Sequence, residues 1–430
     1  MFYSLQGVLR DSLLIKPNRK ENMHVLIVTY IYPPEHAPAG INARELAEAL
    51  AQRGHQVTIL TGWPSHPKGT LYPGWKAKLL HEEKIGVRTT LVRCIHSFQP
   101  RLKLTGKMYY YLTFAISSFL MGMRIKKIDV VLIQSTPLFG VTTAILLGKL
   151  KCAKIFYWVN DVHPESAINS GMLRNAAIAR LMKAIDTWAC QSSDIVGTLT
   201  DDMQLLLLHR GLHASKVIVQ RNWVNESRIY PSDRENPWRM RHGLSRDTFV
   251  VLYAGTIGFI SGAEVVIDAA QLLRENRRIL FLIVGEGPVK GKLEALARKY
   301  NLSNTRFLPF QEEQDLNFMQ ATGDVGLVTL LPKAGESSIP SKMYGYAAAG
   351  RPVIACVADD SSTAKFVRDN DLGWVVPPCD GDALAGAIQN ASLDQEACHR
   401  KGENARRFFV GEFGRKVQSE RFCAILETLG

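Results

Sequence analysis

Residues 337–355 read Ser-Ser-Ile-Pro-Ser-Lys-Met-Tyr-Gly-Tyr-Ala-Ala-Ala-Gly-Arg-Pro-Val-Ile-Ala, and this stretch is the most informative part of the sequence. Pro340 and Ser341 are typical of a helix start, Gly350 is typical of a helix end, and an apolar strand follows. The first turn of such a helix presents unpaired backbone N–H groups and a partial positive charge, to which Lys342 adds a full charge. The stretch therefore predicts an α/β unit whose helix binds a nucleotide diphosphate.

The size and composition of the chain predict two globular domains in a reducing compartment. Of the 430 residues, 46% are hydrophobic and 21% are charged, a composition that excludes a disordered chain. The chain is also too long to fold around one hydrophobic core, so two domains are expected. Seven cysteines are scattered without a Cys-x-x-Cys pair, which argues against a zinc site or a disulfide framework. These features predict a cytoplasmic protein.

The positive charge is concentrated in the first half of the chain. The net charge is +12; residues 23–222 carry 23 basic and 12 acidic side chains, whereas residues 223–430 carry 25 and 26. Such asymmetry suggests an anionic surface as partner, either nucleic acid or lipid. Because no basic segment with interleaved aromatic residues accompanies it, we expect no nucleic-acid partner.

Alternating apolar runs and helical patterns divide the chain into two Rossmann-like halves. Residues 1–22 form an extension without a secretory pattern. The first domain is expected over 23–222 and the second over 223–405, with a polar, proline-containing linker at their junction. Residues 406–430 are expected to form a helix that packs back toward the first domain.

Continuous apolar runs predict strands that are buried on both faces. In the first domain these are expected at 24–30, 57–60, 89–93, 130–134, 154–159 and 195–199, and in the second at 249–253, 281–284, 306–308, 324–330, near 354 and at 373–376. A helix is expected from Asn42 to Arg53, after a loop that contains Ala39 and Gly40.

Seven motifs in this order resemble the family-four retaining glycosyltransferases, which have two Rossmann-like domains facing each other across a cleft (the GT-B fold). The resemblance spans residues 23–430. The motifs are Pro38-Ala-Gly40 with Arg44, Arg53-Gly-His-Gln-Val-Thr-Ile-Leu-Thr61, Tyr253-Ala-Gly-Thr-Ile-Gly258, Ile283-Val-Gly-Glu-Gly-Pro288, Phe307-Leu-Pro309, Pro340-Ser-Lys342 and Ala347-Ala-Ala-Gly-Arg-Pro-Val353.

A narrower resemblance is to the branch that builds bacterial capsule, O-antigen and exopolysaccharide units. It is carried by Trp63-Pro-Ser-His-Pro-Lys-Gly69, Tyr72-Pro-Gly74, Ser135-Thr-Pro137 and Asn160-Asp-Val-His-Pro-Glu165. The resemblance implies transfer of a hexose or N-acetylhexosamine from a nucleotide diphosphate sugar, with UDP-sugars favoured. It also implies a saccharide acceptor on a polyprenyl diphosphate, at the inner face of the cytoplasmic membrane.

The departing diphosphate accumulates negative charge, which either a metal ion or fixed donors must stabilise. Asp380-Gly-Asp382 precedes a helix and is better interpreted as its cap, and Asp369-Asn-Asp371 lies in a turn. We therefore expect no metal and no cofactor, since the nucleotide sugar is a substrate. Fixed donors are expected from glycine turns and Lys342, although one glycine alone would more often be an ordinary β-to-α turn.

The expected site residues come from both domains. Asp161 and Glu336 are the catalytic candidates, of which Glu336 has a solvated loop carboxylate as its alternative. The expected phosphate and acceptor loop contains Ala39, Gly40, Arg44 and His163, although a lone histidine is more often structural. The expected donor-binding residues are Gly255, Thr256, Gly258, Gly285, Glu286, Gly287, Pro309, Phe310, Pro340, Ser341 and Lys342.

Two positions depart from the family pattern. Phe259 follows the second-domain glycine turn where the family carries a basic pair, and Gly345 stands where a ribose-binding glutamate is usual. We interpret the chain as a variant branch that still turns over. The alternatives are a nucleotide-sugar epimerase and a nucleotide-sugar-binding subunit with weak activity.

Residues 108–123 are uncharged, begin with aromatic side chains and have basic flanks. Sixteen residues are fewer than the ~20 that span a bilayer. The segment therefore suits either a helix that lies in the membrane interface or a helix buried in the first domain. The charge of this domain favours peripheral attachment to an anionic membrane.

Overall fold

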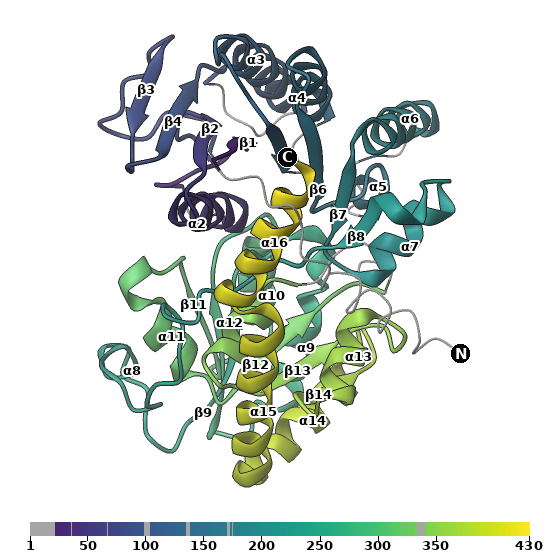
Figure 1. The fold of residues 1–430 in the computed structure, drawn as a ribbon. Coiled ribbons are helices and arrows are strands. Elements are labelled where there is room, and N and C mark those ends of the chain that lie inside the picture. The colour runs from purple at the N-terminus through teal and green to yellow at the C-terminus, as the bar shows by residue number, and fades with distance from the viewer. Residues whose placement is uncertain are drawn as a thin grey trace.

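The computed structural model describes residues 22–35, 37–66, 68–98, 104–134, 138–169, 173, 175–332 and 340–430. They form two α/β domains, each built on a largely parallel sheet, as the sequence predicted (Figure 1). The first domain lies at the top of Figure 1 and the second at the bottom, and the C-terminal helices run between them.

The first sheet has the strand order β3-β4-β2-β1-β5-β6-β7-β8, and only β3 is antiparallel to its neighbour. Its strands are β1 (His24–Val28), β2 (Gln56–Gly62), β3 (His81–Lys84), β4 (Thr89–Cys94), β5 (Val130–Gln134), β6 (Lys154–Val159), β7 (Ile195–Thr198) and β8 (Val217–Val219). The six predicted strands are confirmed, whereas β3 and β8 were not predicted.

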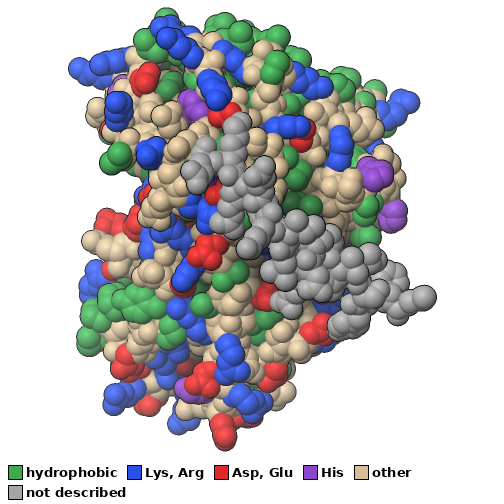
Figure 2. All heavy atoms as spheres, in the orientation of Figure 1, with side chains coloured by type: hydrophobic (Ala, Val, Ile, Leu, Met, Phe, Trp, Pro, Cys, Tyr) green, Lys and Arg blue, Asp and Glu red, His purple; other side chains and the backbone are tan. Residues whose placement is uncertain are grey.

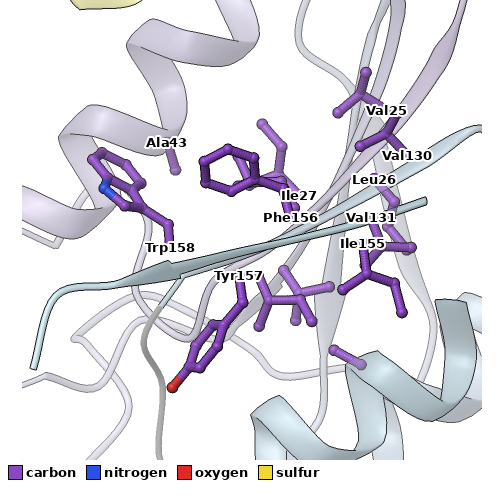
Figure 3. Close-up of a cluster of buried hydrophobic side chains, with 14 of the residues drawn as sticks. Val25, Leu26, Ile27, Ala43, Val130, Val131, Ile155, Phe156, Tyr157 and Trp158 are labelled. Carbon is purple, nitrogen blue, oxygen red and sulfur yellow. The ribbon is translucent and has the colours of Figure 1, made fainter. Parts of the chain in front are cut away.

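Helices cover both faces of this sheet. They are α2 (Pro38–Gln52), α3 (Leu104–Met123), α4 (Leu138–Leu150), α5 (Glu165–Asn169), α6 (Ala176–Ser192) and α7 (Asp201–His209). On β6, Phe156 and Trp158 point toward α2, while Tyr157 points to the opposite face (Figure 3). Since neighbouring side chains of a strand alternate between its faces, this apolar run supplies both halves of the core.

The helix after β1 begins earlier than predicted. We expected Ala39 and Gly40 in a loop, but both lie in the first turn of α2, because Pro38 occupies a position where a missing N–H costs nothing. A Cβ atom on Gly40 would lie 2.9 Å from the carbonyl oxygen of Ile31. Glycine is therefore required there by the close approach of the helix to the loop after β1.

The second sheet is entirely parallel, with the order β11-β10-β9-β12-β13-β14. Its strands are β9 (Phe249–Ala254), β10 (Ile279–Val284), β11 (Thr305–Leu308), β12 (Val325–Thr329), β13 (Val353–Cys356) and β14 (Gly373–Val376). Its helices are α8 (Pro237–Arg241), α9 (Glu264–Leu272), α10 (Lys290–Lys299), α11 (Leu316–Thr322), α12 (Lys342–Ala348), α13 (Ser362–Asp369) and α14 (Gly381–Leu393).

Two C-terminal helices join the domains. Helix α15 (Gln395–Phe413) packs on α12 of the second domain, and α16 (Arg415–Leu429) packs on α2 of the first. The ring of Phe422 lies 4.9 Å from those of Phe156 and Trp158, inside the first core. The predicted boundary after residue 405 falls inside α15, and the chain passes between domains at Gly414.

A buried ionic contact fixes the end of α16. Glu427 accepts hydrogen bonds from Arg53 at 2.6 and 2.8 Å and lies 3.1 Å from the ring of His55. Burial disfavours the ionised carboxylate, but the hydrogen bonds from Arg53 and His55 outweigh it, so the pKa of Glu427 lies below its usual value.

We predict that Glu427→Gln lowers the free energy of unfolding by about 1–3 kcal/mol at neutral pH. A depressed carboxyl pKa stabilises the fold above the unfolded-state pKa, and this stabilisation disappears as pH falls through the folded-state pKa. The difference in melting temperature between wild type and variant should therefore shrink in acid. Glu275→Gln, at a side chain that is 90% exposed, is the matched control. A difference that does not change with pH would contradict the assignment.

Candidate functional site

The expected donor-binding residues lie along one edge of the second sheet. Gly255 and Thr256 follow β9, the Gly285–Gly287 turn follows β10, Pro309 and Phe310 follow β11, and Pro340, Ser341 and Lys342 lead into α12, which comes after β12. These four strands are neighbours in the order β11-β10-β9-β12. Ligands of open parallel sheets bind at this carboxyl edge.

Tyr346 fixes α12 against this edge. Its buried hydroxyl accepts a hydrogen bond from the backbone N–H of Ala254 at 2.7 Å. Its ring packs so closely on β12 that a Cβ atom on Gly326 would lie 2.2 Å from it. Sequence reasoning missed this tyrosine, for which the Tyr-Gly-Tyr pattern in the helix was the available signal.

Lys342 is directed toward the end of β9. Its Nζ atom lies 3.7 Å from the centre of the Tyr253 ring and donates to the carbonyl oxygen of Thr256 at 3.3 Å. A cation over an aromatic face is stabilised electrostatically, and this contact limits the directions that the lysine explores. Ser341 occupies the N-cap position of α12, but its hydroxyl makes no capping hydrogen bond.

The glycine turns after β9 and β10 pack directly on each other. Gly255 and Gly285 have φ angles of +131° and +149°, and a Cβ atom on Gly285 would lie 2.0 Å from the carbonyl oxygen of Gly255. The N–H of Gly255 donates to Val284 O, and that of Ile257 to Glu286 O. These two N–H groups hold the turns together and are therefore not available to a ligand.

Gly258 differs from those glycines. Its φ of −92° suits any residue, and a Cβ atom there would meet only the Thr256 methyl group at 4.0 Å. Among the described residues, the N–H groups of Thr256 and Gly258 have no hydrogen-bond acceptor. Neither backbone strain nor protein packing accounts for glycine at position 258.

The flanks of the site contain one ion pair and two exposed aromatic rings. Glu286 binds Lys290 one helical turn later, at 2.8 Å. The ring of Phe310 is 54% exposed after β11, and that of Phe259 is 58% exposed after β9. The structure thus leaves aromatic surface at the ends of two strands on this edge.

Gly345, which stands where the family usually carries a glutamate, faces α11. A Cβ atom there would lie 2.8 Å from the side-chain amide nitrogen of Gln320. The Gln320 amide therefore occupies the space that a longer side chain at 345 would enter. Sequence reasoning did not identify Gln320, because its contact with Gly345 joins two separate helices.

Asp161 and His163 follow β6 in the first domain. Part of the Asp161 side chain is exposed to solvent. The protein atoms around its carboxyl group nevertheless displace water and raise its pKa, and the electrostatic effect of His163 opposes this rise. Arg210 holds this loop, because it donates to the carbonyl oxygen of His163 at 2.7 Å and pairs with Glu165 and with Asp186.

Ala39, Gly40 and Arg44 lie on α2, at the edge after β1. Arg44 is 3.8 Å from Glu48 and lines a groove between α2 and the β3–β4 hairpin. The structure therefore directs this side chain to the side of the first domain, and no described hydrogen bond connects it to the second-domain residues. Glu336 lies outside the described residues.

The Asp-x-Asp strings have structural partners. Asp380 accepts a hydrogen bond from the N–H of Ala383 and caps α14, which confirms the predicted cap. Asp371 pairs with Lys401 and Arg400. Within the described part of the chain, no group of three or more His, Cys, Asp or Glu side chains is placed to hold a metal ion.

Each of the two domains matches a known protein family. Residues 39–223 match the "Glycosyl transferase 4-like domain" family, and residues 235–408 match "Glycosyl transferases group 1". The colanic acid biosynthesis glycosyl transferase WcaI of Escherichia coli K12 is 30% identical over 383 residues, covering 86% of this chain and 92% of that protein.

Solved structures share the fold over nearly the whole chain. Sucrose-phosphate synthase from Thermosynechococcus elongatus superposes with a TM-score of 0.75 at 17% identity, covering 95% of this chain and 99% of that one. Anabaena HepE in complex with UDP superposes with a TM-score of 0.67 at 14% identity, covering 94% and 100%. The chain therefore belongs to the GT-B glycosyltransferases, in the branch that makes bacterial surface polysaccharides.

Proposed function

We propose that this glycosyltransferase moves a hexose or N-acetylhexosamine from a UDP-sugar to a saccharide on a polyprenyl diphosphate, with retention of configuration and without a metal ion. The observation that carries the proposal is the placement of Lys342 over Tyr253, beside the loops that follow β9 and β10. A fixed ammonium group at this edge suits a leaving diphosphate, whose charge grows in the transition state.

Backbone donors complete the proposed phosphate site. The N–H groups of Thr256 and Gly258 lie in the same turn as the carbonyl group that Lys342 contacts. Glycine at 258 is explained if a ligand passes close to the backbone, because neither strain nor packing requires it. One aspartate of each Asp-x-Asp string, Asp380 and Asp371, is engaged elsewhere, which favours these donors over a divalent ion.

A uracil base would lie at the end of β11. Pro309 and Phe310 follow this strand, and the exposed Phe310 ring offers an apolar surface for a base. HepE, which shares the fold, is solved with UDP. We therefore favour UDP over other nucleotides, with Glu286 beside the donor.

Asp161 would act on the acceptor side. The protein atoms around the Asp161 carboxyl group raise its pKa, and a carboxylate beside the reacting sugar interacts with positive charge that develops there. We propose that Asp161 holds the acceptor hydroxyl or stabilises the positive charge on the sugar ring, and that His163 contacts the donor phosphate. In a retaining reaction the leaving phosphate oxygen itself can receive the acceptor proton, so no separate base is assigned.

Lys342→Ala should weaken binding of UDP by roughly tenfold to a hundredfold, because one charge-assisted contact contributes about 1.5–3 kcal/mol. Isothermal titration of the purified protein with UDP measures this change. Lys292→Ala is the matched control, since Lys292 pairs with Glu264 on the surface of the same domain. Equal affinity for wild type and Lys342→Ala would refute the phosphate site.

Removal of divalent ions should leave the transfer rate unchanged. The test compares the initial rate of sugar transfer from a UDP-sugar onto a short-chain polyprenyl diphosphate saccharide, with and without excess EDTA. Loss of activity that added Mg²⁺ or Mn²⁺ restores would contradict metal-independent transfer.

Asp161→Asn should reduce kcat by at least about a hundredfold while UDP affinity stays within the error of titration, because the carboxylate is assigned to the reacting sugar and acceptor. Asp359→Asn, at an exposed aspartate of the second domain, is the control. If wild-type protein binds UDP but transfers nothing to any acceptor, the binding-subunit alternative would replace the proposed reaction.

A further inference from the structure

The outer side of α3 is apolar where a surface helix is normally polar. Every exposed side chain among residues 108–123 is hydrophobic or aromatic: these residues are Met108, Tyr109, Leu112, Ile116, Leu120 and Met123. They recur at three- and four-residue spacing, so they form one stripe along the helix. Their exposed fractions reach 62% at Tyr109 and 55% at Leu120.

The inner side of the same helix packs against the first domain. Tyr110 and Phe114 are buried against the first domain, and the Tyr110 hydroxyl donates to the carbonyl oxygen of Tyr30 at 3.1 Å. The helix is therefore neither wholly buried nor free to rotate, and the stripe remains on the surface. In the described part of the chain, no helix has both the length and the apolar character needed to cross a bilayer.

Helix α4 extends the apolar surface. It packs on α3 so closely that a Cβ atom on Gly122 would meet the side chain of Leu147, and it exposes Phe139, Leu146 and Leu150. Lys151 ties its end to α3, because its Nζ atom donates to the carbonyl oxygen of Met123 at 2.8 Å. The two helices thus present a rigid apolar face, which we call the α3–α4 face.

The charge around this face has one sign. Residues 104–127 and 138–154 contain no Asp or Glu, whereas they carry seven lysines and arginines in total. Of these, Arg124, Lys126 and Lys149 are exposed at the helix ends. Figure 2 shows hydrophobic and basic side chains together on the upper end of the first domain, where α3 and α4 lie in Figure 1.

We infer that the α3–α4 face docks on an anionic lipid surface. Apolar side chains that enter the headgroup region, with basic residues beside them, match a negatively charged bilayer. A second copy of the chain would place the same positive charges opposite each other, which opposes self-association. The occupant is therefore the membrane rather than a partner subunit.

This docking deepens the proposed function and rests on it for its biological role. The middle of α3 is anchored to the carboxyl edge of the first sheet: Thr113 accepts from the N–H of Ser97, and Ser117 donates to the carbonyl oxygen of Ile95. Both partners follow β4. A bilayer along α3 therefore comes close to the edge that carries the acceptor residues, so a lipid-linked saccharide reaches the site without leaving the membrane.

The test is flotation of full-length protein with vesicles of phosphatidylcholine alone or with phosphatidylglycerol. We expect binding to the anionic vesicles that decreases with salt, and a loss of roughly tenfold or more in Ile116→Asp/Leu120→Asp and in Arg124→Glu/Lys126→Glu. Leu272→Asp/Leu393→Asp, at exposed leucines of the second domain, should bind like wild type.

Equal binding to neutral and anionic vesicles, or undiminished binding of Ile116→Asp/Leu120→Asp, would overturn the inference. So would a wild-type dimer that becomes a monomer in this variant, because the face would then join two copies. Titration with UDP keeps the two proposals separate: variants that bind UDP normally but no longer float are folded, and failure of wild type to bind UDP would refute the donor site alone.

Discussion

A buried hydrogen bond between a helix and a strand determines where Lys342 lies in the second domain. Tyr346 accepts from the last residue of β9 while its ring lies against β12, so α12 sits across the two central strands of the sheet. Because backbone N–H groups buried without a partner are costly, the helix cannot shift along the edge without breaking this contact. Lys342 lies one helical turn before Tyr346, so the same hydrogen bond fixes its position.

The first domain uses the same principle with different residues. Arg210 connects two helices and the loop after β6, and it pairs with Asp186 in the core. Burial raises the pKa of Asp186, and Arg210 and His163 oppose that rise. Both sheets thus hold their candidate site loops through buried polar contacts, whereas the strands themselves are held by apolar packing.

The sequence was sufficient for the fold because its central strands are continuous apolar runs, each buried on both faces. It failed for β3, whose polar residues become a strand only by pairing with β4 at the sheet edge. The sequence also did not distinguish glycines that packing requires, such as Gly285, from Gly258, which packing does not require. Gly285 is needed because the backbone of Gly255 passes beside it, and a contact across thirty residues leaves no local pattern.

The sequence predicted that the candidate donor-binding residues follow strands of the second sheet, and they lie along one edge of it, but the contacts that hold them there were not predicted. Lys342 was identified because its motif is local, whereas the partner that positions its helix lies 92 residues away. Arg44 was identified as well, yet its side chain lines a groove beside the β3–β4 hairpin. Chain position gives the end of a strand at which a residue lies, but the direction of a long side chain depends on packing between elements.

The last helix of the chain completes the core of the first domain. Phe422 and Leu426 of α16 lie among residues from β1, β5 and β6, so the first sheet to be synthesised has an unfinished apolar surface until α16 leaves the ribosome. Folding of the N-terminal half therefore depends on synthesis of α16. A prematurely terminated product would expose that surface and become a target for chaperones and proteases rather than a partly active enzyme.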